Sequence, residues 1–296
     1  MKKYLICLAV LALASLYGCQ EKPLDGNSQI IDSKVEQNDF DKWLYANFVE
    51  TYNIELKYRM EMNESSISYW LVPAEYDKSI QMAKLIKHLC LEPYDEITGS
   101  KEFIRANYPK MIHLIGSAAY NNNNTFVLGT AEGGLKITLY MINSLTLDPE
   151  DLNYYYFKTM HHEFAHILHQ TKPYSSDFNM ISGADYVTDT WSSFWESEEE
   201  CLQNGFISEY ASKETNEDFV EIFAIYVTNT EAEWNTLLTT AGSEGAAKIQ
   251  AKFDIVYNYM KTTWGVDMDL LREIIQRRQG EISTLDLDSL DVENLN

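Results

Sequence analysis

Four of the six histidines in this 296-residue chain lie within nine residues, from His161 to His169. Among them, His162, Glu163 and His166 form the pattern H-E-x-x-H. On an α-helix, residues four apart share one face and lie about 6 Å apart along the axis. Two imidazoles at this spacing can converge on one metal ion at roughly 2.0–2.1 Å. The pattern therefore predicts a zinc site.

Glu163 follows the first histidine of the pattern, so we expect it to face a water molecule beside the ion and not the ion itself. Zinc lowers the pKa of water towards about 7. Glu163 could then accept the proton and deliver it to a leaving group. This is the chemistry of a zinc-dependent hydrolase, with Zn²⁺ as the cofactor.

The residues around the pattern predict a buried helix that positions it. No Pro or Gly occurs in residues 153–170, and Pro173 provides a stop signal. The apolar flanking residues are Tyr154, Tyr155, Phe157, Met160, Phe164, Ala165, Ile167 and Leu168. The alternative is a chance match, but it would leave unliganded His and Glu side chains in an apolar helix, which is costly. We therefore favour the metal site.

His169 shares a helical face with the two histidines of the pattern, yet His162 and His169 are about 10.5 Å apart along a straight helix. One ion cannot easily bridge that span. Metzincins place a Gly and then a third His at the positions that His169 and Lys172 occupy here, so the metzincin pattern is absent. We expect His169 to support a ligand histidine or to pack, and His161 to face away. The third ligand must come from elsewhere.

The best candidates for the third ligand lie in residues 209–229. Glu217 and Glu221 are four apart on an apolar helix, so both carboxylates point the same way. In a gluzincin the first acid binds zinc and the second accepts a hydrogen bond from a ligand histidine. We favour Glu217 as the ligand, with Glu221 as the alternative. An amphipathic helix with solvated acids is the other explanation. Tyr210 could donate a hydrogen bond to an oxyanion, although the chain has 20 tyrosines.

Residues 1–19 are predicted to be a lipoprotein signal peptide. Lys2 and Lys3 precede an apolar stretch, residues 4–16, that is too short to span a bilayer. Residues 16–19 resemble a bacterial lipobox, in which Cys19 is lipidated; an ordinary signal peptide is the alternative. The polar residues 20–38 suit a flexible tether.

The net charge of −22 makes nucleic acid an improbable partner. No C-x-x-C pair occurs, so a zinc-finger site is excluded. Cys90 and Cys201 remain after Cys7 and Cys19 are set aside, and we expect them to be free and buried, although they could pair. The mature chain is long enough for a sizeable core.

Periodicity predicts an α+β fold, with a mixed strand layer against the H-E-x-x-H helix and a mostly helical C-terminal half. We expect a zincin-like catalytic domain at 39–280 and an acidic tail, disordered or loosely docked, at 281–296. Predicted helices are 39–52 (capped by Asp39), 75–91, one starting at Asp148-Pro149, 246–263 and 268–278. Predicted strands are 54–60 and the pair 126–128 and 135–142, joined through Gly133-Gly134, with a turn at 121–124.

Several of these stretches together resemble the zinc-binding metallopeptidase lipoproteins of Bacteroidetes, also described as substrate-import-associated zinc metallohydrolase lipoproteins. The resemblance covers nearly the whole chain. It is carried by Cys19 and by residues 43–48, 52–55, 115–117, 129–134, 162–170 and 216–219. It implies an outer-membrane lipoprotein, at the cell surface or the periplasmic face, associated with a TonB-linked nutrient import system.

A more distant similarity is to the catalytic domain of anthrax lethal factor. There a zinc-binding Glu begins an E-x-F-A-E stretch, and a catalytic Tyr lies seven residues before it. Glu217, Glu221 and Tyr210 match those positions, with Val220 in place of the Ala. The resemblance implies a gluzincin peptidase acting on a peptide or protein substrate. A zinc hydrolase of a non-peptide amide or glycan-linked substrate, and a binding lipoprotein with a vestigial site, are the alternatives; the intact Glu163 argues against the last.

Overall fold

The computed structural model describes residues 37–61, 64–120, 126–127, 129–132 and 135–293. One compact unit begins at Asn38. The predicted signal peptide, nearly all of the predicted tether and the predicted turn at 121–124 lie outside the described residues.

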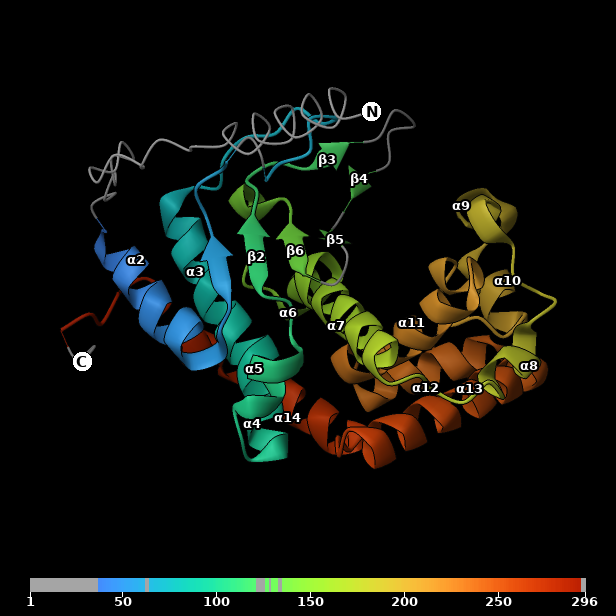
Figure 1. Cartoon of the computed structure of the whole chain (residues 1–296). Helices are drawn as coiled ribbons and strands as arrows, with labels where there is room; N and C mark the ends of the chain where they lie inside the picture. The colour runs from blue at the N-terminus through green and yellow to red at the C-terminus, as the bar shows by residue number, and fades with distance from the viewer. Residues whose placement is uncertain (1–36, 62–63, 121–125, 128, 133–134, 294–296) are drawn as a thin grey trace, which may run out of the picture. The chain divides into compact units, whose positions relative to one another are not determined.

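A four-stranded mixed sheet forms the strand layer of this unit (Figure 1). Its strands run in the order β1-β2-β6-β5, with β1, β2 and β6 parallel and β5 antiparallel at the edge. Alternate residues such as Leu56, Ile112 and Ile137 point into the main core, as the period of two requires. The strands are β1 (Glu55–Lys57), β2 (Met111–Leu114), β5 (Gly129–Glu132) and β6 (Lys136–Leu139).

The predicted pairing of 126–128 with 135–142 is wrong. Gly129–Glu132 (β5) pairs with β6, whereas Phe126–Val127 (β4) pairs with Ala119–Tyr120 (β3) in a separate two-stranded sheet. Gly133-Gly134, the expected joint, lies outside the described residues. The physical reason is that short strands carry little period-two signal, so a shift of pairing by a few residues cannot be recognised in sequence.

Helices alternate with the strands in the first half of the chain, and the two helices predicted at 39–52 and 75–91 are confirmed. Asn38, not Asp39, caps the first of them: its side chain accepts from Asp41 N, and the Asp41 side chain accepts from Asn38 N. The helices before β6 and just after it are α2 (Asp39–Leu44), η1 (Tyr45–Glu50), α3 (Tyr76–Ile86), η2 (Lys87–Leu91), α4 (Glu92–Thr98), α5 (Glu102–Asn107) and η3 (Ile142–Ser144).

The H-E-x-x-H pattern lies on α7 (Lys158–Thr171), which contacts the edge strand β5 (Figure 1). α7 continues a helical run that starts at α6 (Pro149–Leu152), capped by Asp148 as predicted, and passes through the π-helical turn η4 (Asn153–Phe157). A π-turn shifts the register of the helix, and such turns often lie near functional sites.

The second half of the chain is helical, as predicted, and is organised around α11 (Thr215–Thr228). Every residue from Glu217 to Thr228 is buried, because α7, α13 and α14 pack around this helix. The other helices are α8 (Phe178–Ser182), η5 (Thr188–Thr190), α9 (Trp191–Phe194), α10 (Glu198–Gln203), η6 (Tyr210–Ser212), α12 (Glu231–Thr240), α13 (Gly242–Thr263), α14 (Met268–Glu281) and η7 (Ile282–Thr284).

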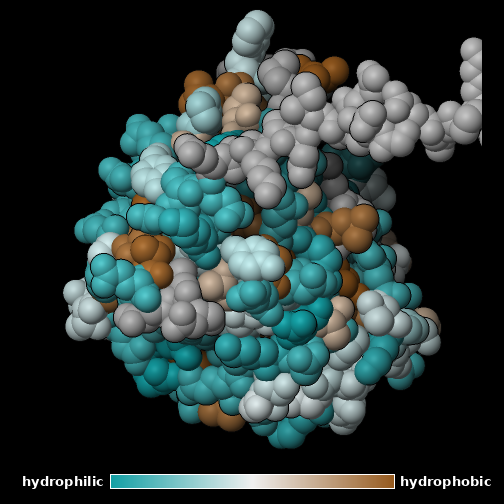
Figure 2. Space-filling model, turned by 60° about the vertical axis from the view of Figure 1, so that its left-hand side comes forward, coloured by the Kyte–Doolittle hydropathy of each residue, from teal (hydrophilic) through white to brown (hydrophobic). Residues whose placement is uncertain are grey.

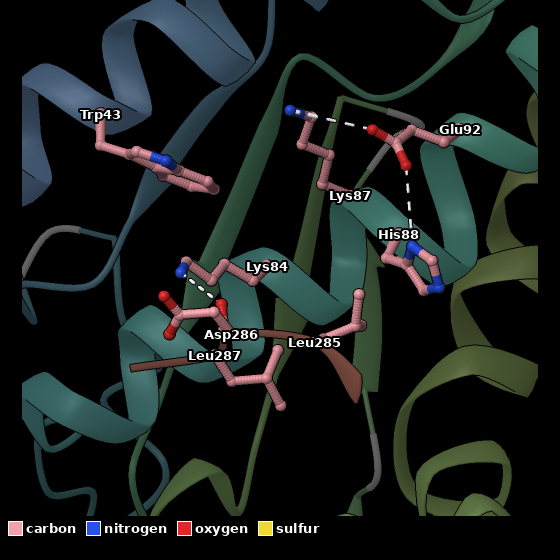
Figure 3. A pocket seen from close by; sticks show the side chains of 8 residues that line it. All are labelled: Trp43, Lys84, Lys87, His88, Glu92, Leu285, Asp286 and Leu287. Atoms are coloured by element: carbon pink, nitrogen blue, oxygen red, sulfur yellow. Dashed lines mark hydrogen bonds and ion pairs between the residues drawn. The ribbon is translucent and has the colours of Figure 1, made fainter. Parts of the chain in front are cut away.

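The acidic segment after α14 is docked on the unit through residue 293, the last one described. Leu287 is buried, and the Lys84 ammonium donates to the backbone oxygens of Asp286 and Ser289. Leu285 and Leu287 of this segment line a pocket of about 250 Å³. Figure 3 shows the side chains around it. The other residues lining it are Trp43, Lys84, Lys87, His88, Glu92 and Asp286.

The face shown in Figure 2 is mostly hydrophilic, with small scattered hydrophobic groups. This composition agrees with the acidic charge of the chain. Within the part of the chain that the structure describes, no helix is both long enough and apolar enough to cross a membrane.

Candidate metal centre

Two helices far apart in sequence bring the predicted site residues together. The apolar side chains of α7 and α11, such as Phe164, Leu168 and Phe223, are buried in the common core. This packing fixes the two helices against each other. Their polar positions, His162 and His166 on α7 and Glu217 on α11, therefore meet along the contact.

One carboxylate oxygen lies between the two histidines of the pattern. Glu217 Oε2 is 3.1 Å from His162 Nε2 and 3.1 Å from His166 Nε2. One ligand atom from each of the three residues lies within 4.8 Å of the others. Glu221, the alternative ligand, approaches His162 only at the other ring nitrogen, so the geometry favours Glu217.

Glu221 holds His162 from behind. Its Oε1 is 2.8 Å from His162 Nδ1, while its Oε2 accepts from Lys158 Nζ at 2.9 Å and from Ser208 Oγ at 2.6 Å. The Glu221 side chain is only 1% exposed. A carboxylate at Nδ1 places the imidazole proton there and leaves the Nε2 lone pair free for a metal.

His169 does the same for His166. His166 Nδ1 is 3.0 Å from His169 Nε2. Burial and the nearby charge of His166 lower the pKa of His169 to about 4, so His169 is neutral and its Nε2 can accept a hydrogen bond from the N–H at His166 Nδ1. The ring of His169 also packs edge-on against Phe219 at 6.1 Å between centroids. Both metal-facing nitrogens are thus oriented by a partner on the opposite side of their rings.

The electrostatics of this centre favour a positive charge. Burial disfavours the charged form of His162, but the hydrogen bonds to Glu217 and Glu221 outweigh it and raise the pKa of His162 to about 9. Burial likewise opposes ionisation of Glu217 and Glu221, yet the neighbouring cations hold the pKa of both carboxyls well below the usual range. Two ionised carboxylates beside His162 and His166 thus favour a cation at this position.

The donor set fits a zinc ion. With zinc bonds of roughly 2.0–2.1 Å and tetrahedral angles, ligand atoms are about 3.3–3.4 Å apart. The two distances from Glu217 Oε2, 3.1 Å each, need to widen by only a few tenths of an ångström. In one class of hydrolases, two imidazoles and one carboxylate bind the catalytic zinc and leave its fourth position open. His162, His166 and Glu217 are the residues that would hold the ion.

Glu163 and Tyr210 border this centre. The Glu163 side chain is half-buried, and among the described residues no hydrogen bond to its carboxylate is found. Burial raises the pKa of Glu163, and the nearby Glu217 and Glu221 charges add to the effect while the two histidines oppose it. The Tyr210 hydroxyl donates to Glu217 Oε1 at 2.8 Å, and burial and that carboxylate raise the pKa of Tyr210 far above its usual value. Tyr210 therefore keeps its proton as a donor.

Comparisons with known proteins name the metal of the family. The family model described as "Putative zinc-binding metallo-peptidase" matches residues 33–269. The chain belongs to this family. A crystal structure of a protein from Bacteroides caccae, described in the same words, is 47% identical, with a TM-score of 0.77. The match covers 89% of this chain and all of that one. No curated protein matches. Zinc is thus the metal named for the family.

Within this zinc-binding metallo-peptidase fold, His161 stays outside the centre, as expected. It is fully buried, its Nδ1 lies 2.8 Å from Tyr94 Oη, and burial lowers its pKa to about 3. Three contributors were missed in the sequence: Lys158, Lys213 and Ser208. The two lysines lie four residues before His162 and Glu217, so helical spacing could have found them. Ser208 comes from a loop, where no periodicity applies.

Proposed function

We propose that this protein is a zinc-dependent peptidase in which Glu163 moves the proton and Tyr210 stabilises the oxyanion. The observation that carries the proposal is the placement of Glu217 Oε2 at 3.1 Å from both His162 Nε2 and His166 Nε2, with an intact glutamate between the two histidines in sequence. Bound zinc supplies Lewis acidity, which lowers the pKa of water and polarises a carbonyl group.

Glu163 and Tyr210 have separate roles in the reaction. Glu163 accepts a proton from the attacking water and returns it to the leaving nitrogen. Its raised pKa makes the carboxylate a stronger base than an ordinary glutamate, which suits a group that must take and then give a proton. Tyr210, always protonated, turns its O–H towards the carbonyl oxygen as negative charge develops there. A site kept only for structure would need no such base, which argues against a vestigial centre.

The test is a peptide-library digestion with the wild type, Glu163→Gln and a control, Glu102→Gln. Glu102 is an exposed acid, with 79% of its side chain accessible. Glu163→Gln keeps the shape and removes the base, so zinc should stay bound while turnover falls by about 10² or more. Glu102→Gln should behave as the wild type. Cleavage by Glu163→Gln at the wild-type rate would overturn the proposed role, and cleavage of non-peptide amides alone would redirect the substrate class.

We further propose that the domain is held at the outer membrane by a lipid on Cys19 and works beside a TonB-linked import complex. The support is the lipobox at residues 16–19 and the polar tether that follows, together with the family resemblance. Cys19→Ser should leave the protein unlipidated and move it from the membrane fraction to the soluble fraction. Unchanged fractionation of Cys19→Ser would contradict the lipid anchor.

A further inference from the structure

Lys213 contacts both Tyr210 and Glu217 Oε1, the carboxylate oxygen that does not contact the two histidines. Its Nζ donates to Glu217 Oε1 at 2.9 Å and to Tyr210 Oη at 3.3 Å, and it lies 5.1 Å from the centre of the Tyr210 ring. Tyr210 donates to the same Glu217 Oε1 at 2.8 Å. The three groups thus form a closed triangle beside the metal-facing oxygen. Lys213 lies between η6 and α11, and its side chain is 30% exposed.

This arrangement raises a difficulty for Tyr210. A tyrosine has a single O–H hydrogen, and here it is given to Glu217. To donate to a substrate oxyanion, Tyr210 must release Glu217 Oε1. The Glu217 side chain is only 9% exposed, so an oxygen left without a donor there would be costly. Lys213 removes the difficulty, because its ammonium already donates to that oxygen.

Resting on the function proposed above, we propose that Lys213 is a positioning residue that keeps Glu217 Oε1 satisfied while the Tyr210 hydroxyl turns to the substrate. A simple helix-end ion pair four residues apart would explain the contact with Glu217 alone. It would not explain why the same ammonium also contacts the Tyr210 oxygen and ring. Because Tyr210 and Lys213 both donate to Oε1, this oxygen keeps one hydrogen-bond donor when either residue is replaced.

The experiment is a double-mutant cycle of Lys213→Met and Tyr210→Phe, with Lys213→Arg as the conservative variant. Lys261→Met is the control, since Lys261 forms an exposed ion pair with Asp267. Lys213→Met should lower kcat by about 10-fold with KM little changed, because Tyr210 stays held at Glu217. Lys213→Arg should restore most of the loss. At zinc concentrations that saturate every variant, Lys213→Met in the Tyr210→Phe background should lower kcat no further, since the Tyr210 hydroxyl that Lys213 would free is gone.

Zinc affinity, measured by competition with a chromophoric chelator, gives a readout that needs no substrate. Each single variant keeps one donor at Oε1, so each should stay within about 3-fold of the wild type, whereas the double variant should lose about 10–100-fold. The idea is overturned if Lys213→Met weakens zinc binding as much as the double variant does. It is also overturned if the double variant binds zinc like the wild type, or if Lys213→Met slows wild type and Tyr210→Phe equally. A wild type that cleaves no peptide would count against the proposed function and leave the affinity cycle decisive for Lys213.

Discussion

Replacing Glu221 with Gln should weaken zinc binding without touching a zinc ligand. The carboxylate of Glu221 accepts hydrogen bonds at both oxygens: from His162 at one, and from Lys158 and Ser208 at the other. A glutamine has the same shape but only one acceptor oxygen. Either the NH2 of its amide group faces the Lys158 ammonium, or the NH2 faces His162 Nδ1. In the second case the imidazole proton moves to Nε2, the nitrogen that would bind the metal.

Both orientations damage the centre, so zinc affinity should fall by about 10–100-fold, which corresponds to about 1.4–2.7 kcal/mol. The fold should survive, because Lys158 is one-third exposed and can turn to water. Chelator competition on the wild type, Glu221→Gln and Lys158→Met measures the effect. Lys158→Met should cost less, since Ser208 still donates to Glu221.

Two outcomes would refute this reasoning. If Glu221→Gln keeps full zinc affinity, the orientation of His162 by its Nδ1 partner has no energetic weight. If Glu221→Ala abolishes zinc binding while Glu217→Ala leaves it intact, Glu221 is the ligand, and the assignment of the two acids must be exchanged.

Three further predictions concern protons and burial. Zinc must displace the proton from His162, whose pKa is about 9 without the metal. Zinc affinity should therefore rise by about 10-fold per pH unit from pH ~6 to ~8 and level off near pH ~9. An affinity that does not change with pH would contradict this. Lys252→Met removes the cation 2.6 Å from the fully buried Asp218, so the free energy of unfolding should drop by about 3–5 kcal/mol. Burial raises the pKa of Asp218 to about 6, so this carboxyl is protonated at pH ~5 and ionised at pH ~8. The free energy of unfolding that Lys252→Met removes, measured by urea titration, should therefore be larger at pH ~8 than at pH ~5. A larger loss at pH ~5 would refute the burial argument. Cys90 and Cys201 are buried, and burial raises the pKa of both thiols to about 12, so alkylating reagents at pH ~8 should label them only after unfolding.

Much of the fold around the site could be predicted from the sequence, because it depends on long helices with strong periodicity. The spacing of His162 and His166, and the acids on the later apolar helix, identified the two elements whose contact builds the centre. The free, buried state of Cys90 and Cys201 was also expected and is confirmed. Fixed helical geometry is what makes such inferences possible.

The parts that sequence could not give depend on packing between distant segments. The acids of α11 could have been solvated, and only the structure shows that Asp218 is fully buried against Lys252, 34 residues later. No local pattern records that pairing. The strand pairing was wrong because strands of two to four residues leave the register open. The docking of the acidic C-terminal segment likewise depends on a distant lysine, Lys84.

The central claim is that His162, His166 and Glu217 hold one zinc ion. Anomalous diffraction at the zinc absorption edge, on crystals grown with zinc, tests it most directly. The account predicts one peak, roughly 2.0–2.2 Å from His162 Nε2, His166 Nε2 and Glu217 Oε2. A peak bound by other side chains, or no peak while zinc analysis shows about one ion per chain, would contradict it.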